Sequence, residues 1–302
     1  MPERFSRESQ IVVAMAGEMA EGLKVTLADG TRIYRPMGLT DSPGGAAVSG
    51  FSTVLIATGL LLTRVTILVR VALVVSLLAG MFCIYVCQVR SIFIITMVCE
   101  IAVFVIVGVQ GEIKRLGSMI FIVPGTIALA TIWAFAVGGD QVSDRFKTLT
   151  ESSAGNVYYE NRGFFVVSTI QDMQDYPIGA GLGRYGMIYQ YFGDKSSQAN
   201  TSLWAEIQPA AWLYDGGVLL IGLYYSLIVF CILQASKHCF SREEGVSILS
   251  PAVFGLNIGT LATTLGSVPF LGTAGTFFWL INAALACMAS SQTSLKRSRS
   301  HR

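Results

Sequence analysis

The sequence predicts an all-α polytopic membrane protein with about seven transmembrane helices, a large extracytoplasmic loop and an N-terminal outer β-hairpin. Apolar residues make up 53% of the 302 residues, whereas only 13% are charged, about half the charged share of a typical soluble domain. The mean hydropathy is +0.59. Because a water-facing surface needs charge, these values exclude a disordered chain, a basic nucleic-acid-binding protein and an ordinary soluble enzyme.

Seven apolar stretches have nearly the length that crosses about 30 Å of hydrocarbon. They are residues 48–63, 68–88, 91–109, 117–138, 211–235, 248–266 and 271–290. The first is short and rich in Gly and Thr, and Asn257 interrupts the sixth. The predicted organisation is an outer segment (1–47), four spans (48–138), a large outer loop (139–210), three spans (211–291) and a basic tail (292–302).

Lysine and arginine distinguish the two sides of the membrane. On the seven-span count, one side receives Arg64, Arg70, Lys114, Arg115, Lys237, Arg242 and the tail residues Lys296, Arg297, Arg299 and Arg302. Cytoplasmic loops carry such an excess, so residues 1–47 and 139–210 are predicted to lie outside. Residues 1–47 contain no signal peptide that would export them. We therefore expect a longer protein with further spans upstream, or else a miscounted first span.

The six cysteines all fall in predicted spans or on the cytoplasmic side, so they indicate no disulfide framework. They are Cys83, Cys87, Cys99, Cys231, Cys239 and Cys287. Cys83 and Cys87 share a helix face, but no His or carboxylate completes a metal site there. We expect neither a metal nor another cofactor.

The first outer segment alternates polar and apolar residues from Lys24 to Arg35 around Asp29-Gly30. This dipeptide supplies the positive φ angles of a tight hairpin turn. The pattern therefore predicts a two-stranded hairpin, and Arg35 taken alone is a solvated residue at the end of a strand.

The second outer segment, residues 139–210, is longer than a connector requires, which usually indicates function. Residues 161–173 are predicted to form a helix that ends before Pro177. Phe164, Phe165 and Ile170 suit a helix that lies at the membrane interface.

A glycine-rich stretch, Gly181-Leu-Gly183-Arg-Tyr-Gly186, matches the dinucleotide-binding fingerprint letter for letter. That interpretation fails because the fingerprint needs a preceding buried strand and a following helix, and Asp-Tyr-Pro-Ile precedes it here. Gly179, Gly181 and Gly183 instead favour a tight loop that brings backbone N–H groups against an anion. A purely structural turn remains the alternative.

Arginine and carboxylate side chains supply the candidate chemistry of the outer side. The planar donor fork of arginine suits phosphate oxygens, and the outer arginines are Arg35, Arg90, Arg145, Arg162 and Arg184. Both histidines, His238 and His301, fall on the cytoplasmic side, so an outer base must be a carboxylate. Glu206, followed by Asp215, is the candidate. Glu100 lies within a span, where an ionisable group is a functional candidate or a carboxyl hydrogen-bonded inside the bundle.

Three outer segments together resemble one family. They are Arg35-Pro-Met-Gly38-Leu-Thr-Asp41-Ser-Pro43, then Gln88-Val-Arg90-Ser91, then Arg162 with Tyr176-Pro177-Ile-Gly179-Ala-Gly181-Leu-Gly183 and Glu206 to Asp215-Gly-Gly. Their order and spacing are similar to the O-antigen ligase and O-antigen polymerase superfamily, membrane glycosyltransferases that use polyprenyl-diphosphate-linked glycans. The resemblance covers roughly residues 30–235. It also fits a missing N-terminus, because family members usually have more spans upstream.

The resemblance implies that Arg162 and Glu206 are catalytic. It also implies a diphosphate-binding set of Arg35, Arg90, Arg145, Arg184, Gly181 and Gly183. Ligases of the family commonly place a His where this chain has Glu206, and a carboxylate also acts as a general base. Glu206 in place of the His also fits a polymerase-like subgroup, an enzyme that uses a different acceptor, or an inactive relative.

The implied function is ligation or polymerisation of polyprenyl-diphosphate-linked glycans on the outer face of the bacterial inner membrane, in surface polysaccharide biosynthesis. The expected partners are the lipid-linked glycan, a lipid or glycan acceptor and the membrane, with no nucleic acid. One alternative is a lipid-linked glycan transporter, for which Glu100, Asn257 and Asn282 are the pointers. Another is an inactive fragment that acts as a scaffold.

Overall fold

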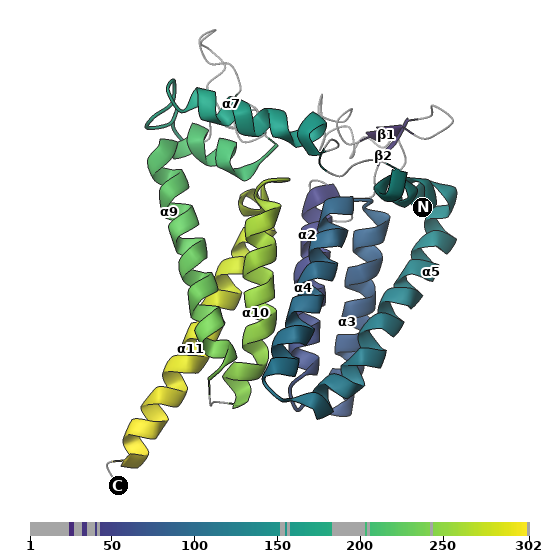
Figure 1. The fold of residues 1–302 in the computed structure, drawn as a ribbon, viewed down its shortest axis with the longest axis vertical. Coiled ribbons are helices and arrows are strands. Elements are labelled where there is room, and N and C mark those ends of the chain that lie inside the picture. Colours follow the sequence, from purple (N-terminus) through teal and green to yellow (C-terminus); the bar gives the residue numbers. More distant parts are fainter. Residues whose placement is uncertain are drawn as a thin grey trace. The chain divides into compact units, whose positions relative to one another are not determined.

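The computed structural model describes residues 24–26, 32–34, 40, 43–151, 155, 158–182, 203, 206–241 and 244–300. It has seven helices that are long and apolar enough to cross a membrane (Figure 1). They correspond in order to the seven predicted spans, so the prediction of a polytopic helical membrane protein is confirmed. The chain divides into two compact units, Met1–Val98 with Val107–Glu151, and Cys99–Ile106 with Ser152–Arg302.

The first unit contains α2 (Pro43–Leu61), α3 (Ile67–Val86), the two ends of α4 (Arg90–Val109) and α5 (Ile113–Glu151). Helices α2 and α3 approach closely where Gly50 faces Gly80. A Cβ atom on Gly50 would lie 2.7 Å from the Gly80 carbonyl oxygen, and one on Gly80 would lie 2.9 Å from the Gly50 carbonyl oxygen. Small residues at such contacts let helix backbones pack tightly in membranes.

Helix α5 packs along α3 and extends beyond its predicted span. The Thr131 hydroxyl donates to the Tyr85 hydroxyl oxygen at 2.7 Å, and the Phe82 and Trp133 rings stack with their centroids 3.9 Å apart. The span was predicted to end at 138, but the helix continues to Glu151. The first part of the segment predicted as a loop is therefore helical.

Two short strands, β1 (Lys24–Thr26) and β2 (Arg32–Tyr34), pair antiparallel with Val25 opposite Ile33. Thr26 pairs with Arg32, so five residues, 27–31, separate the two strands, more than the two of a tight turn at Asp29-Gly30. The turn itself and Arg35 lie outside the described residues.

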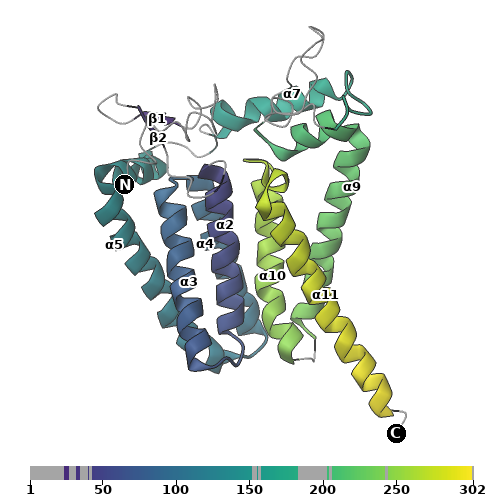
Figure 2. The same cartoon turned by 180° about the vertical axis from the view of Figure 1, so that it is seen from behind.

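The second unit contains the middle of α4 and the elements of the large loop and last three spans. These elements are η3 (Tyr159–Gly163), α7 (Phe164–Asp172), α9 (Gln208–Cys239), α10 (Glu244–Thr263), η4 (Pro269–Leu271) and α11 (Thr273–Ser300). Helices α10 and α11 lie side by side (Figure 2). Their amides Asn257 and Asn282 exchange two hydrogen bonds, each 2.8 Å long. Residues 292–300, predicted as a tail, continue α11.

Helix α9 is broken at Gly216 and Gly217, whose backbone angles are not helical. The predicted span of 211–235 therefore starts on the wrong side of this break. Residues 218–239 form the continuous part of the helix and would extend about 33 Å, enough to cross the hydrocarbon of a bilayer. Residues 208–215 form a separate short segment that packs beneath α7 (Figure 1).

Candidate functional site

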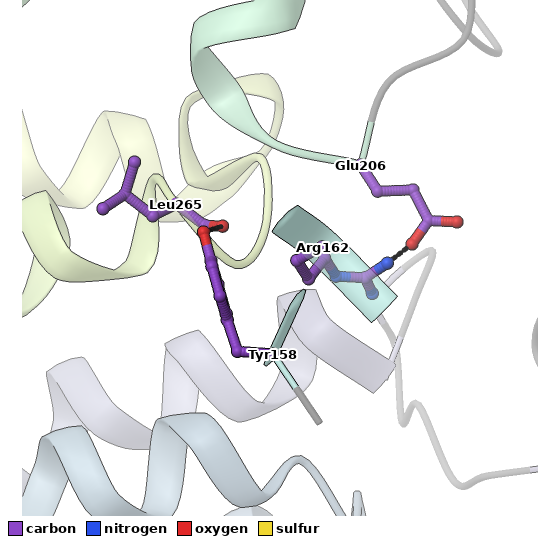
Figure 3. Close-up of polar contacts among 4 residues, drawn as sticks. All are labelled: Tyr158, Arg162, Glu206 and Leu265. Atoms are coloured by element: carbon purple, nitrogen blue, oxygen red, sulfur yellow. Dashed lines mark hydrogen bonds and ion pairs between the residues drawn. The ribbon is translucent and has the colours of Figure 1, made fainter. Parts of the chain in front are cut away.

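Arg162 and Glu206, the two residues predicted to be catalytic, form an ion pair between Arg162 Nη1 and Glu206 Oε2 (Figure 3). They are 44 positions apart in the sequence, from 162 to 206. Each side chain is 34% exposed, so a ligand can reach both the guanidinium and the carboxylate. The structure thus brings together a strong phosphate-binding group and a candidate base at one partly exposed position.

Arg162 belongs to η3, a five-residue π-helical turn that leads directly into α7. Such widened turns are rare and often occur at functional sites. Gly163 closes the turn: a Cβ atom there would lie 2.7 Å from Cδ2 of the Tyr159 ring. A larger residue at 163 would require the exposed Tyr159 ring to move.

Tyr158 precedes η3 and connects it to α10. Its hydroxyl donates to the Leu265 carbonyl oxygen at 3.1 Å, just after the end of α10 (Figure 3). Burial raises the pKa of the Tyr158 hydroxyl, and the positive charge of Arg162 opposes this rise. The hydroxyl therefore keeps its proton, and with it the hydrogen bond, at neutral pH.

Glu206 is held by the residues that follow it. Ile207 and Gln208 are 1% and 2% exposed. The Gln208 backbone N–H donates to the Thr264 carbonyl oxygen at 2.9 Å, and its side-chain Oε1 accepts from the Phe270 N–H at 2.9 Å. The backbone next to Glu206 is therefore fixed to the segment between α10 and α11.

Two backbone hydrogen bonds join the glycine motif that follows α7 to the break in α9. The Ala180 N–H donates to the Tyr214 carbonyl oxygen at 2.6 Å, and the Val218 N–H donates to the Pro177 carbonyl oxygen at 3.1 Å. These two bonds satisfy backbone groups that the break in the helix would leave without partners. We call residues 177–180 the strap.

Two glycines make the strap possible. Gly179 has φ +82° and a Cβ atom there would lie 2.7 Å from the Gly216 nitrogen, while Gly217 has φ +68° and its Cβ would lie 2.2 Å from the Pro177 carbonyl oxygen. Gly181 also has positive φ, but the space beside it is open. Of the predicted anion-binding glycines, Gly181 lies beside the strap and Gly183 lies outside the described residues.

Helix α7 packs against the short first segment of α9. Phe165 and Val166 contact a cluster formed by Ile207, Ala210, Ala211 and Tyr214, and the Tyr214 hydroxyl donates to Asp172 Oδ2 at 2.6 Å. Of the residues predicted to face the membrane interface, Phe164 and Ile170 are exposed. Phe165 instead packs into the cluster.

The other arginines predicted for the site belong to the first unit or are not described. Arg90 is the first residue of α4 in the first unit, and Arg145 lies in α5. Arg35 and Arg184 lie outside the described residues. Glu100 is 3% exposed, in the part of α4 where the Cys99 thiol donates to the Gly255 carbonyl oxygen of α10. Among the described residues, no group of three His, Cys, Asp or Glu side chains is placed to hold a metal ion.

Sequence reasoning missed Tyr158 and Gln208 as supports of the site. The only signals were an aromatic residue near Arg162 and a glutamine just after Glu206, and both residue types are common in outer loops. Comparison with family models, curated proteins and solved structures finds no match for this chain.

Proposed function

We propose that the protein is a membrane glycosyltransferase that ligates or polymerises glycans carried on a polyprenyl diphosphate. The observation that carries this proposal is the Arg162–Glu206 ion pair. The resemblance to the O-antigen ligase and polymerase superfamily assigns both residues to one reaction, and they are in contact although 44 positions separate them. The reaction would take place on the outer face of the bacterial inner membrane, the side opposite the basic loops.

Arg162 would act on the leaving group. Its guanidinium presents several N–H donors in a plane and binds phosphate oxygens in pairs. As the glycosidic bond to the carrier breaks, the diphosphate takes the electron pair and its negative charge grows. Fixed positive charge aimed at such an oxygen is often the largest catalytic contribution.

Glu206 would act on the acceptor. Its carboxylate removes the proton from an acceptor hydroxyl, whose oxygen forms a bond to the anomeric carbon while the carbon–oxygen bond to the diphosphate breaks. Attack opposite to the leaving group inverts the anomeric centre. The charges balance without a metal, because the carboxylate gains the proton and the diphosphate leaves with the electron pair.

The ion pair is the resting state in this scheme. An incoming diphosphate competes with Glu206 for the guanidinium, because both ligands are anions that bind the same donors. When the diphosphate takes its place, the carboxylate is released toward the acceptor. The resemblance also assigns Gly181, which lies in the same unit as Arg162, to diphosphate binding.

Reconstitution tests the proposal directly. The purified protein in proteoliposomes is given a polyprenyl-diphosphate-linked glycan and an acceptor, and transferred glycan is measured. We expect Arg162→Ala and Glu206→Gln to lose about a hundredfold or more of the rate, since a general base contributes at least this much. Asp175→Asn, an exposed carboxylate of the same unit, is the matched control and should keep the wild-type rate.

Full activity in both variants would remove Arg162 and Glu206 from the reaction. Movement of labelled lipid across the bilayer without transferred glycan would favour the transporter alternative. Two of the residues that suggested a transport path, Asn257 and Asn282, bond to each other through their amides.

A further inference from the structure

We propose that Tyr158 is a positioning residue that holds Arg162 opposite Glu206 by tying η3 to the end of α10. The hydrogen bond from the Tyr158 hydroxyl to the Leu265 carbonyl oxygen carries the inference (Figure 3). The catalytic consequence of this role rests on the proposed function, whereas the positioning itself does not.

Tyr158 directly precedes η3, the short π-helical turn that carries Arg162. Arg162 follows it by four residues, within the five-residue π-turn. A turn of this kind has a weaker hydrogen-bond pattern than an α-helix and needs outside contacts to keep its shape. The contact of Tyr158 with the Leu265 carbonyl oxygen supplies one at the point where the turn begins.

Glu206 is anchored to the same place from the other side. The Gln208 backbone N–H bonds to the Thr264 carbonyl oxygen, which is next in the chain to the Leu265 carbonyl bound by Tyr158. Thr264 is fully buried, and its hydroxyl contacts the Tyr225 hydroxyl at 3.3 Å. Two consecutive carbonyls at the end of α10 therefore fix the two segments that carry the ion pair.

Because the segments that carry Arg162 and Glu206 are both bound to the carbonyls of Thr264 and Leu265, Tyr158 also affects where Arg162 lies relative to Glu206. If the tie to Leu265 is lost, Glu206 stays fixed through Gln208 while Arg162 gains freedom to move away from it. The fraction of molecules with Arg162 in place falls, and the apparent affinity for a ligand of Arg162 falls with it. The chemistry after binding is unchanged, because the bound diphosphate holds Arg162 itself.

A double-substitution cycle on stability tests the positioning without any enzyme assay. The apparent unfolding temperature of the purified protein is measured for wild type, Tyr158→Phe, Glu206→Gln and the double variant. If Tyr158 acts through the ion pair, Tyr158→Phe lowers the temperature less in the Glu206→Gln background than in wild type. Strictly additive effects would overturn the inference.

Initial rates provide the second test. Tyr158→Phe removes one hydrogen bond, so we expect KM for the donor to rise by about two- to tenfold with kcat within about twofold of wild type. Tyr159→Phe, an exposed neighbour, is the matched control and should leave both constants unchanged. A merely structural role would lower kcat through loss of folded protein and leave KM unchanged, which would refute the positioning role.

The two tests separate this inference from the proposed function. If wild type transfers no glycan, the proposed function fails and the stability cycle alone decides on Tyr158. If wild type is active and the cycle is additive, the transferase stands and the role of Tyr158 is refuted.

Discussion

At the residue scale, the central feature is that Glu206 is paired with the Arg162 guanidinium, the same cation that the diphosphate of the proposed substrate needs. A carboxylate bound to Arg162 competes with diphosphate for the same N–H donors. Glu206 is therefore predicted to weaken diphosphate binding and yet to be required for glycan transfer. A residue that only binds the substrate would not show these two opposite effects.

We therefore expect Glu206→Gln to bind diphosphate more tightly while it loses transfer. Neutralising the competing anion should lower the Kd for inorganic diphosphate several-fold, because hydrogen bonds to charged groups contribute more than neutral ones. Calorimetric titration of the detergent-solubilised protein measures this, with Asp175→Asn as the control. Weaker binding by Glu206→Gln would show that the carboxylate does not compete at Arg162.

The glycines of the site show why residue identity alone did not predict its shape. The sequence indicated that Gly179, Gly181 and Gly183 form a tight loop, and a tight loop is present at Gly179. Its partner, the break at Gly216 and Gly217, lies within an apolar stretch that was interpreted as part of a continuous span. Asp215-Gly216-Gly217 is a local turn signal, but it was outweighed by the apolar residues around it, and the contact with the strap that accompanies the break cannot be seen in the sequence.

At the element scale, the strap and the break in α9 depend on each other. The strap bonds to the Val218 N–H and the Tyr214 carbonyl oxygen, on opposite sides of the break. Gly217 has positive φ and lies against the Pro177 carbonyl oxygen. Neither element keeps its backbone hydrogen bonds without the other.

Gly217→Ala should therefore destabilise the protein markedly. A Cβ atom would collide with the Pro177 carbonyl oxygen, 2.2 Å away, and an L-residue with positive φ adds strain of about 1–3 kcal/mol. We expect the apparent unfolding temperature in detergent to fall by several degrees.

Gly222→Ala is the matched control for this prediction. Gly222 lies in the continuous part of α9, and nothing lies within 4 Å of a Cβ atom there. Alanine stabilises a helix interior by about 0.5–1 kcal/mol relative to glycine, so this variant should be unchanged or more stable. Equal unfolding temperatures for the two variants would mean that the strap does not constrain Gly217.

At the scale of the whole molecule, composition was sufficient for the membrane fold but not for the site. Seven long apolar runs determine seven helices, because each must satisfy its own backbone in hydrocarbon. Residue type made Arg162 and Glu206 separate candidates, and only the family resemblance assigned them to one reaction. Its geometry depends on the Thr264 and Leu265 carbonyls, and a carbonyl is present at every residue, so no sequence pattern distinguishes these two.

At the scale of the whole molecule, the polar residues inside the spans bear on the choice between an enzyme and a transporter. The residues concerned are Asn257 and Asn282. Asn257 and Asn282 donate to each other across α10 and α11, as expected of amides that join helices within a membrane. Asn257→Leu alone would leave the Asn282 amide without this partner. We expect a loss of about 0.6–2 kcal/mol, measured as a lower unfolding temperature.

Replacing both amides by leucine should recover part of this loss, because no buried amide is then left unsatisfied. The double variant should also transfer glycan at the wild-type rate, since the pair serves packing and lies apart from the Arg162–Glu206 chemistry. A folded double variant that has lost all activity would instead place the amides on a substrate path. That result would show that the amide pair does more than join α10 to α11, because the transfer reaction itself would then depend on it.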